Sequence, residues 1–128
     1  MLRALNAGAI NVSIKNLTEG IEGCKVGGFD CLALSPGLVA DQSSEEITEL
    51  LFDAMVAPGA WGIPFNWRGT QDEYNAGLEA MKSQAVKMHD IEVKRCATWI
   101  MPGSNDLTIE ENTDYHRTRL QQIGRAHV

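Results

Sequence analysis

The residues that could carry chemistry in this sequence are few and scattered. Three cysteines, Cys24, Cys31 and Cys96, form no Cys-x-x-Cys pair, and their odd number disfavours both a disulfide framework and a zinc site. Cys31 and Cys96 lie in apolar runs, which predicts inert core thiols. Of the histidines, His89 falls near the end of a predicted helix and His116 falls within another, so we interpret them as a surface residue and a structural residue.

Metal-assisted chemistry requires carboxylates and imidazole that converge on one ion, and no predicted strand end in this chain offers Glu, Asp and His together. Arg68 is a candidate for binding an anion, because its planar guanidinium matches the geometry of a phosphate group. The alternative for Arg68 is a solvated loop charge. Asn66 and Ser104 also follow apolar runs, and their short polar side chains could equally hold loop turns.

Bulk properties limit the class of protein. The chain of 128 residues is 44% hydrophobic and 22% charged, which is typical of one globular domain. A net charge of −6, with Lys and Arg scattered along the chain, argues against a general nucleic-acid binder. The sequence has no apolar stretch near the roughly 20 residues of a membrane span and no signal-peptide core, so we expect a cytoplasmic protein that does not engage membranes.

A repeated helix-start signal divides the sequence into units. In a capping box, the side chain of a Ser, Thr, Asn or Asp accepts a hydrogen bond from the backbone three residues on, where a Glu reaches back to the N–H of the cap. Four such pairs follow apolar runs: Asn16 with Glu19, Ser43 with Glu46, Thr70 with Glu73, and Thr108 with Glu111. Successive caps lie 27, 27 and 38 residues apart, which predicts four helices in units of similar length.

Each cap is preceded by a short apolar run bounded by Gly, Pro or Asp, as expected of a β-strand. The four predicted strands are Ala9–Ile14, Phe29–Leu34, Ala60–Phe65 and Val93–Met101. The last is apolar on both faces at residues 96–101, which is typical of a strand in a parallel sheet covered by helices.

The segments after the caps have helical periodicity, which predicts amphipathic helices with one buried face. The expected buried stripes are Ile47, Leu50, Leu51, Ala54 and Met55 after Ser43, and Tyr74, Leu78, Met81, Ala85 and Met88 after Thr70. A shorter helix around Leu17, Ile21 and Cys24 is expected to end at Gly27-Gly28, and a fourth surrounds Tyr115, Leu120 and Ile123.

The alternation of strand and helix predicts an α/β fold with parallel strands and right-handed crossovers. Eight units of about 30 residues would approach the roughly 250 residues of a (β/α)₈ barrel, so this chain corresponds to about four β/α units of a partial TIM barrel. A doubly wound sheet also fits the length. Its dinucleotide-binding version should carry Gly-x-Gly-x-x-Gly after the first strand, where this chain has residues 13–16 and no such loop.

Three stretches carry a likeness to a known family. They are Gly28–Pro36, Pro58–Arg68, and Thr98–Ser104 followed by Tyr115-His116-x-x-Arg119-Leu120. Together they resemble the N-terminal half of the xylose isomerase-like barrels of the sugar phosphate isomerase/epimerase family, and the likeness extends to about Gln122.

The resemblance implies a TIM barrel with a divalent metal (Mn, Mg, Co or Zn) that isomerises or epimerises a small sugar or sugar phosphate beside its carbonyl. The family's metal ligands, two Glu, one Asp and one His, sit on strands of the second half, so neither a metal ligand nor a catalytic residue is carried over to this chain. Active sites of such barrels lie at the C-terminal ends of the strands. That rule places eight residues at the rim of the site: Asn11, Ser13, Ser35, Asn66, Trp67, Arg68, Trp99 and Ser104.

Five of these rim residues are our substrate-binding candidates: Asn66, Trp67, Arg68, Trp99 and Ser104. For Trp67 and Trp99, packing in the core or in the pocket wall fits their bulk better than stacking on a substrate.

The last six residues, Ile123–Val128, match one reading frame of a common sequencing-library adapter (ATC GGA AGA GCA CAC GTC). We therefore expect residues 1–122 to form the N-terminal half of a barrel and residues 123–128 to be a non-native tail. The alternative is that these six residues are a native part of the last helix.

The sequence thus predicts a fragment of a metal-dependent sugar (phosphate) isomerase or epimerase that is inactive alone. We expect it to self-associate through exposed sheet edges, which offer unpaired backbone groups. Two alternatives stay open. One is a barrel nuclease of the endonuclease IV type, which would need basic loops and several His ligands. The other is a non-catalytic, flavodoxin-like α/β binding module.

Overall fold

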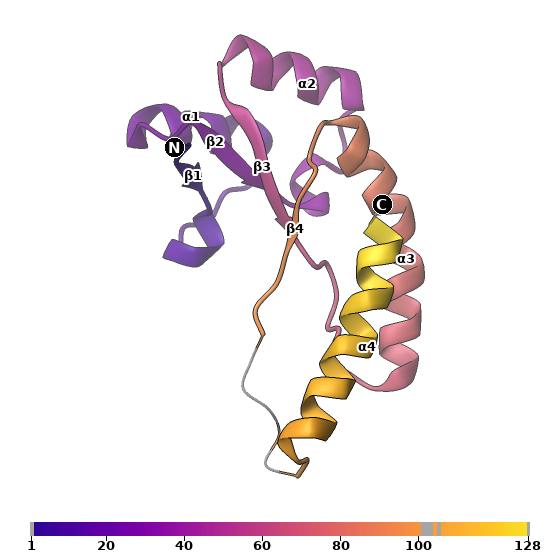
Figure 1. Ribbon diagram of the computed structural model, residues 1–128. Coiled ribbons are helices and arrows are strands. Elements are labelled where there is room, and N and C mark those ends of the chain that lie inside the picture. The colour runs from indigo at the N-terminus through magenta and orange to yellow at the C-terminus, as the bar shows by residue number, and fades with distance from the viewer. Residues whose placement is uncertain (1, 101–103, 105, 128) are drawn as a thin grey trace. The chain divides into compact units, whose positions relative to one another are not determined.

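The computed structural model describes residues 2–100, 104 and 106–127, apart from the side chain of His127. Strands and helices alternate along it (Figure 1): β1 (Ala4–Leu5), α1 (Leu17–Gly27), β2 (Cys31–Leu34), α2 (Ser44–Asp53), β3 (Ala57–Gly62), α3 (Gln71–Asp90), β4 (Cys96–Ala97) and α4 (Ile109–His127). Two short 3₁₀ helices, η1 (Ala7–Ile10) and η2 (Pro36–Val39), follow β1 and β2. The strands pair in parallel in the order β1-β2-β3-β4, which confirms the predicted partial barrel of four β/α units.

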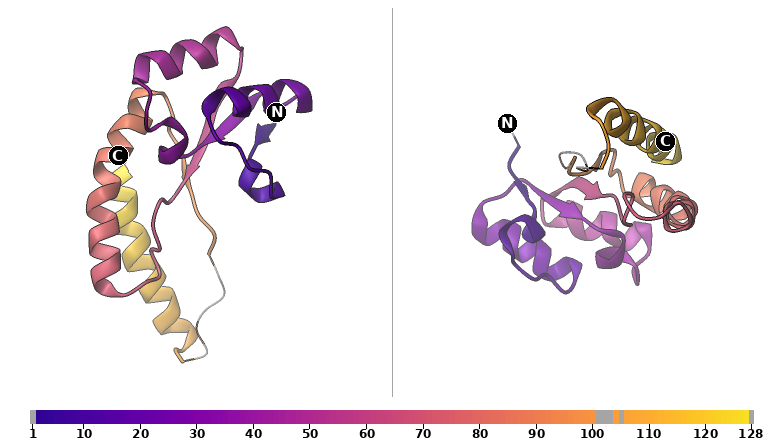
Figure 2. Two further views of the ribbon diagram at one scale, coloured as in Figure 1. Left: turned by 180° about the vertical axis from the view of Figure 1, so that it is seen from behind. Right: turned by 90° about the horizontal axis from the view of Figure 1, so that it is seen from below.

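The chain divides into two compact units. The first, Met1–Gly62 with Lys87–Ala97, contains the whole sheet together with α1 and α2. The second, Ile63–Val86 with Thr98–Val128, contains most of α3, all of α4 and the segments that follow β3 and β4. Within the second unit, α3 and α4 lie alongside each other in both views of Figure 2.

The core of the first unit lies where the helices pack on the sheet. The register pairs Ala4 with Cys31, Cys31 with Ala57, and Trp61 with Cys96. Buried apolar side chains come from three strands and two helices: Leu5, Leu32, Leu34 and Trp61 with Leu17, Ile21, Cys24, Ile47 and Leu51. Their removal from water is the main favourable term that holds these elements together.

The first strand prediction is wrong. The predicted strand Ala9–Ile14 overlaps η1 and an irregular segment, and the strand that pairs with β2 is Ala4–Leu5. Ile10 is 61% exposed, so the apolar run does not face a core. The physical reason is local, because Asn6 caps a 3₁₀ turn by accepting from the Ala9 N–H, and Asn11 ends that turn in the left-handed region.

The remaining strands are predicted with varying accuracy. The segment Phe29–Leu34 contains β2, whereas β3 begins three residues before the predicted Ala60 and ends at Gly62. Only Cys96–Ala97 of the predicted strand Val93–Met101 is paired, and Met101 lies outside the described residues. Trp99 and Ile100 are exposed, so burial on both faces does not hold for this run.

The helix starts follow the predicted caps. Ser43, Thr70 and Thr108 each exchange both hydrogen bonds of a capping box with the Glu three residues later. Asn16 accepts from the Glu19 N–H as predicted, but the Glu19 carboxylate accepts from the N–H of Lys15 instead of that of the cap. These bonds satisfy backbone donors that a helix N-terminus leaves unpaired.

The predicted stripes describe α3 better than α2. Tyr74, Met81, Ala85 and Met88 are buried along α3, and Leu78 is half-buried. In α2 only Ile47 and Leu51 of the predicted stripe are buried. Leu50 is exposed within the helix, and Ala54 and Met55 lie beyond its end at Asp53, Met55 with a φ of 57°. At the end of α1, Gly28 takes the left-handed conformation that the predicted Gly-Gly terminus requires.

Helix α4 continues to His127, and Ile123 is buried within the second unit. The boundary between a native segment 1–122 and a tail 123–128 stays a prediction. Val128, the last residue of the predicted tail, lies outside the described residues. Among the helices in the described part of the chain, none is both long and apolar enough to cross a membrane.

Candidate functional site

In a parallel barrel the active site lies at the C-terminal ends of the strands. In the first unit, Asn6 follows β1 and Ser35 follows β2 directly. Both side chains hold a turn, since Asn6 accepts from the Ala9 N–H (3.2 Å) and Ser35 from the Leu38 N–H (3.3 Å). The predicted rim residues Asn11 and Ser13 lie beyond η1, so Asn6 takes the strand-end position that was assigned to them.

The second unit is organised around Trp67, which lies in the segment after β3. Its side chain is only 4% exposed, and its indole Nε1–H donates to the hydroxyl of Thr98 at 2.9 Å. Thr98 is the residue that follows β4. This hydrogen bond therefore ties together the chain segments that leave two neighbouring strands.

Arg119 of α4 is the main polar group of this unit. It is 8% exposed, and its guanidinium lies 4.5 Å from the ring centroid of Tyr74 and 4.4 Å from that of Tyr115. Nη1 donates to the backbone oxygens of Trp67 and Gly69, each at 2.8 Å. A buried charge is costly unless it is compensated, and here two aromatic faces and two carbonyl dipoles provide the compensation.

Side chains of α4 hold three consecutive carbonyls of the loop after β3. Arg119 takes those of Trp67 and Gly69, while the Tyr115 hydroxyl donates to the oxygen of Arg68 at 3.2 Å. Arg119 Nη2 also donates to Oε1 of Gln71 at 3.3 Å, at the start of α3. Side chains of α4, the helix that follows β4, therefore fix the conformation of this loop.

Tyr74 of α3 completes the contact between the two helices. Its hydroxyl donates to the backbone oxygen of Arg119 (3.0 Å) and lies 3.1 Å from Oε1 of Gln122. Burial raises the pKa of the Tyr74 phenol, an effect that the nearby Arg119 charge partly offsets. Gly77, one turn further along α3, leaves the space that the Phe65 ring fills.

The five substrate-binding candidates do not all come together. Asn66, Trp67 and Arg68 share one loop, where the guanidinium of exposed Arg68 lies 5.7 Å from the Trp67 ring centroid. Ser104 belongs to the turn before α4, where its amide donates to Oδ1 of Asn112 at 3.0 Å. Trp99 is 79% exposed, so packing in the core does not describe it.

One of the candidates holds a turn through its side chain, as the alternative interpretation held, because the Ser104 hydroxyl accepts from the Asp106 N–H at 3.0 Å. At Asn66 it is the backbone oxygen that accepts from the Gly69 N–H, at 3.0 Å. The substrate-binding role of all five candidates stays a prediction.

Sequence reasoning missed Arg119, Tyr115, Thr98 and Asn6. For the first two the signal was in the quoted motif Tyr115-His116-x-x-Arg119, because residues four apart share one face of a helix. Asn6 carries the signal of a cap residue before a short apolar run. Thr98 begins the third quoted stretch, but no local pattern indicates its hydrogen bond to Trp67, which is 31 positions away.

His116 has a structural environment in keeping with its interpretation. Its ring packs edge-on against Trp67, with centroids 5.3 Å apart, and against Tyr115 at 5.6 Å. Both ring nitrogens are buried, and neither has a hydrogen-bond partner among the described residues. The ring thus contributes apolar packing between the loop after β3 and α4.

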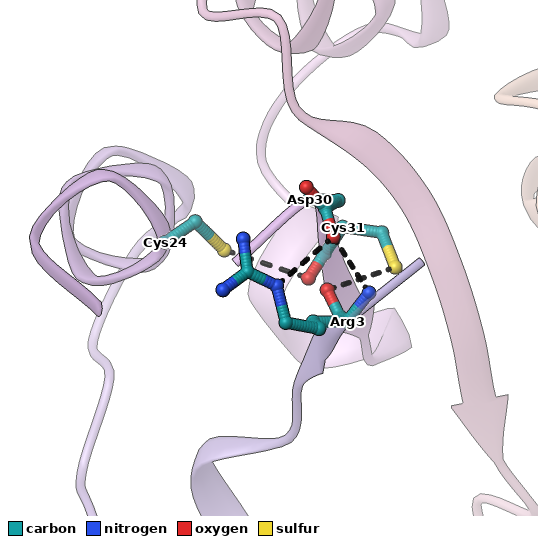
Figure 3. A network of polar contacts seen from close by, with 4 residues as sticks. All are labelled: Arg3, Cys24, Asp30 and Cys31. Atoms are coloured by element: carbon teal, nitrogen blue, oxygen red, sulfur yellow. Dashed lines mark hydrogen bonds and ion pairs between the residues drawn. The ribbon is translucent and has the colours of Figure 1, made fainter. Parts of the chain in front are cut away.

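A polar network at the opposite ends of β1 and β2 is structural (Figure 3). The Asp30 carboxylate accepts from the backbone N–H of Arg3 (2.7 Å) and from its Nε (3.4 Å), and the Arg3 backbone oxygen accepts from the Asp30 and Cys31 amides. The hydrogen bond from the Arg3 backbone holds the pKa of Asp30 below its usual range. Because Arg3 and Asp30 precede their strands, the network fastens the start of the sheet, where barrel residues serve stability.

Cys24 and Cys31 are core thiols, whereas Cys96, also predicted to be one, is only half-buried, and the inertness of these thiols stays a prediction. Cys24 and Cys31 are buried, and their thiols donate to the backbone oxygens of Cys31 (3.6 Å) and Arg3 (3.5 Å). Burial raises the pKa of Cys24, and it raises the pKa of Cys96 to about 11. Thiols that stay protonated at neutral pH are poor nucleophiles and poor metal ligands.

No three His, Cys, Asp or Glu side chains come together as a metal site within residues 2–100, 104 and 106–127. The described part of the chain therefore does not fit a divalent metal on its own.

Comparisons with known proteins give the fold. No protein-family model matches the sequence, and no curated protein sequence is significantly similar to it. Solved structures do match. The IolI protein with a zinc atom has a TM-score of 0.74 and 16% identity over 98% of this chain and 47% of its own.

A second solved structure is D-psicose 3-epimerase with D-tagatose from Clostridium cellulolyticum H10. It has a TM-score of 0.61 and 13% identity over 100% of this chain and 50% of its own. This chain thus spans about half the length of both structures and shares the fold of that half, a partial TIM barrel.

Proposed function

We propose that this chain supplies the first four β/α units of a sugar isomerase or epimerase barrel. The observation that carries the proposal is the fold match to IolI, which covers nearly the whole of this chain at a TM-score of 0.74. The resemblance of three sequence stretches, Gly28–Pro36, Pro58–Arg68 and Thr98–Leu120, to the same family also supports the proposal. The reaction would move a proton at the carbon next to a carbonyl, between a carboxylate base and the sugar.

The proposed parent enzyme uses a divalent metal, for which the zinc in IolI is the support. A bound divalent ion polarises the carbonyl oxygen of the sugar and so acidifies the neighbouring C–H. Because the described residues provide no cluster of three ligands, we assign the metal ligands and the base to another part of the parent. The chain of 128 residues is accordingly proposed to be inactive by itself.

The part we assign to this chain is to shape one side of the sugar site. Asn66 and Arg68 are the polar side chains on the loop after β3, and the Arg68 guanidinium suits a phosphate group if the sugar carries one. Trp67 is buried in the same loop and is assigned to the wall of the site, while Trp99 and Ser104 follow β4.

We further propose that two copies of the isolated chain associate through the edges of the sheet. In the described structure β1 pairs only with β2, and β4 only with β3, so each leaves one edge of backbone groups. Pairing of β4 of one copy with β1 of the other, and the reverse, would bring eight parallel strands together. Size-exclusion chromatography with light scattering is expected to show a dimer, and a clean monomer at high concentration would count against this proposal.

The proposed reaction is tested by solvent exchange. The parent protein, loaded in turn with Mn²⁺, Mg²⁺, Co²⁺ and Zn²⁺, is incubated in D₂O with ketoses and ketose phosphates, and deuterium next to the carbonyl is followed by NMR. We expect exchange with at least one sugar, and none with residues 1–128 alone as the matched control. A metal-loaded parent that exchanges no proton of any sugar in the panel would refute the proposal.

A further inference from the structure

Two helix cations in this protein hold backbone carbonyls instead of carboxylates. In the first unit, Nζ of Lys87 on α3 donates to the backbone oxygens of Val39 (2.5 Å), Ala40 (3.2 Å) and Gln42 (2.8 Å). These oxygens belong to the connection from β2 to α2. In the second unit, Arg119 on α4 does the same for the connection from β3 to α3.

Both arrangements supply hydrogen-bond donors to backbone carbonyls that lie outside helices and strands. Carbonyls in a loop have no ladder or helix partner, and a buried carbonyl left without a donor costs stability. Among the ion pairs of the described residues, none involves Lys87 or Arg119, so the N–H donors of each cation are available to the loop carbonyls. Surface ion pairs such as Lys82 with Glu79 fix no backbone and contribute little.

The two side chains match their targets. The Lys87 ammonium is a point charge with three donors, and three carbonyls surround it. The Arg119 guanidinium is planar, so it can lie between two aromatic rings while it reaches two carbonyls and the Gln71 amide oxygen. A lysine at position 119 would keep the charge but lose the planar guanidinium that lies between the two rings.

We propose that Lys87 and Arg119 are positioning residues. Each lies on the helix of one β/α unit and sets the conformation of the strand-to-helix connection in the unit before it. Lys87 fixes the connection after β2, which begins with Ser35. Arg119, with Tyr115, fixes the loop after β3, and so determines how Asn66 and Arg68 are presented. The proposal rests on the proposed function only for what these loops bind, and the positioning itself can be tested without any activity.

The test is site-resolved amide hydrogen exchange by NMR on the 128-residue chain. The reporter amides are Leu38, which donates to the Ser35 oxygen at 3.0 Å, and Gly69, which donates to the Asn66 oxygen at 3.0 Å. The Leu32 amide in β2 reports opening of the sheet. Lys87→Met and Arg119→Met remove the two cations.

The controls remove the same charge from the same helices. Lys82→Met and Arg117→Met do so at exposed positions whose partners are the carboxylates of Glu79 and Asp114. Because neither control residue holds a loop carbonyl in the described structure, both controls are expected to leave both reporter amides nearly unchanged.

We expect Arg119→Met to accelerate exchange at Gly69 by about tenfold or more and to leave Leu38 unchanged, and Lys87→Met to do the reverse. Acceleration that is uniform over Leu38, Gly69 and Leu32 would overturn the proposal, because it would indicate a general loss of stability. Unchanged reporters would overturn it as well.

Milder variants keep the test decisive if Arg119→Met does not fold. Tyr115→Phe removes only the hydroxyl that donates to the Arg68 oxygen and keeps the ring against Arg119. Arg119→Lys keeps the positive charge but loses the planar guanidinium group with its several N–H donors. Both are expected to accelerate exchange at Gly69 and not at Leu38, and equal effects at the two amides would contradict the assignment.

Discussion

The hydrogen bond between Trp67 and Thr98 leads to a quantitative prediction. The Trp67 indole is almost fully buried, and its Nε1–H donates to the Thr98 hydroxyl at 2.9 Å. Thr98→Val keeps the shape of the side chain but removes the acceptor, so a largely buried N–H loses its partner. We expect the free energy of unfolding to fall by about 1 kcal/mol, near the lower end of the range for an unsatisfied buried donor, because Thr98 itself is exposed and water can reach part of the site.

A double-mutant cycle separates this bond from other effects of the substitution. Trp67→Phe removes the donor, and in that background Thr98→Val should cost close to nothing. Thr113→Val is the matched control, because the Thr113 hydroxyl donates to the Ile109 oxygen at 2.8 Å within α4 and does not bond to Trp67. Its cost should be the same with and without Trp67.

Urea denaturation followed by circular dichroism, with the slopes compared between variants, measures all four corners of the cycle. A coupling energy of about 1 kcal/mol between Trp67 and Thr98 is expected, and none between Trp67 and Thr113. The reasoning is refuted if Thr98→Val costs as much in the Trp67→Phe protein as in the wild type.

Three further predictions concern the first unit. Ser43→Ala removes the capping-box acceptor of α2 and should lower the free energy of unfolding by about 1 kcal/mol in urea denaturation, and an unchanged midpoint would contradict it. Burial raises the pKa of Cys96 to about 11. Its alkylation by iodoacetamide, followed by mass spectrometry, should therefore be slow at pH 8 and accelerate only as the pH nears 11. Rapid labelling of Cys96 at pH 8 would contradict this. The pKa of Asp30 is lowered in the folded protein, so its contribution to stability is complete above the ordinary pKa of 3.8 and is lost as pH falls through the lowered pKa. Asp30→Asn should therefore flatten that part of the curve of unfolding free energy against pH. A curve unchanged in shape would refute the assignment.

The parts of the fold that sequence predicts are those set by local chemistry. The capping boxes at Ser43, Thr70 and Thr108 involve residues three apart, so their spacing alone identifies them. The left-handed Gly28 at the end of α1 is likewise a local requirement. Repetition of these signals was enough to predict the strand–helix alternation of a partial barrel.

Strand positions were harder, because parallel pairing is decided between distant segments. Ala4–Leu5 is too short to stand out, and it becomes a strand by pairing with Cys31 and Leu32, 27 residues away. The run from Ala9 looked like a strand by composition, but a side chain before it, Asn6, favours a 3₁₀ turn. Local propensity is a weak guide where one capping residue can redirect the backbone.

The candidate site shows the same division. The loop of Asn66, Trp67 and Arg68 was predicted from its place after an apolar run. The residue that holds that loop, Arg119, is 52 positions from Trp67 and 50 from Gly69. A buried arginine paired with carbonyls leaves no complementary acidic residue in the sequence to reveal it.

Sequencing of the parent gene beyond codon 122, with reads long enough to pass the predicted junction, tests whether this chain is half of a barrel. We predict that codons 123–128 differ in the parent and that four more strand–helix units follow, with Glu, Asp, His and Glu at strand ends. Native sequence that carries these six codons and then stops would contradict both the tail and the half-barrel, and would favour a small α/β binding module.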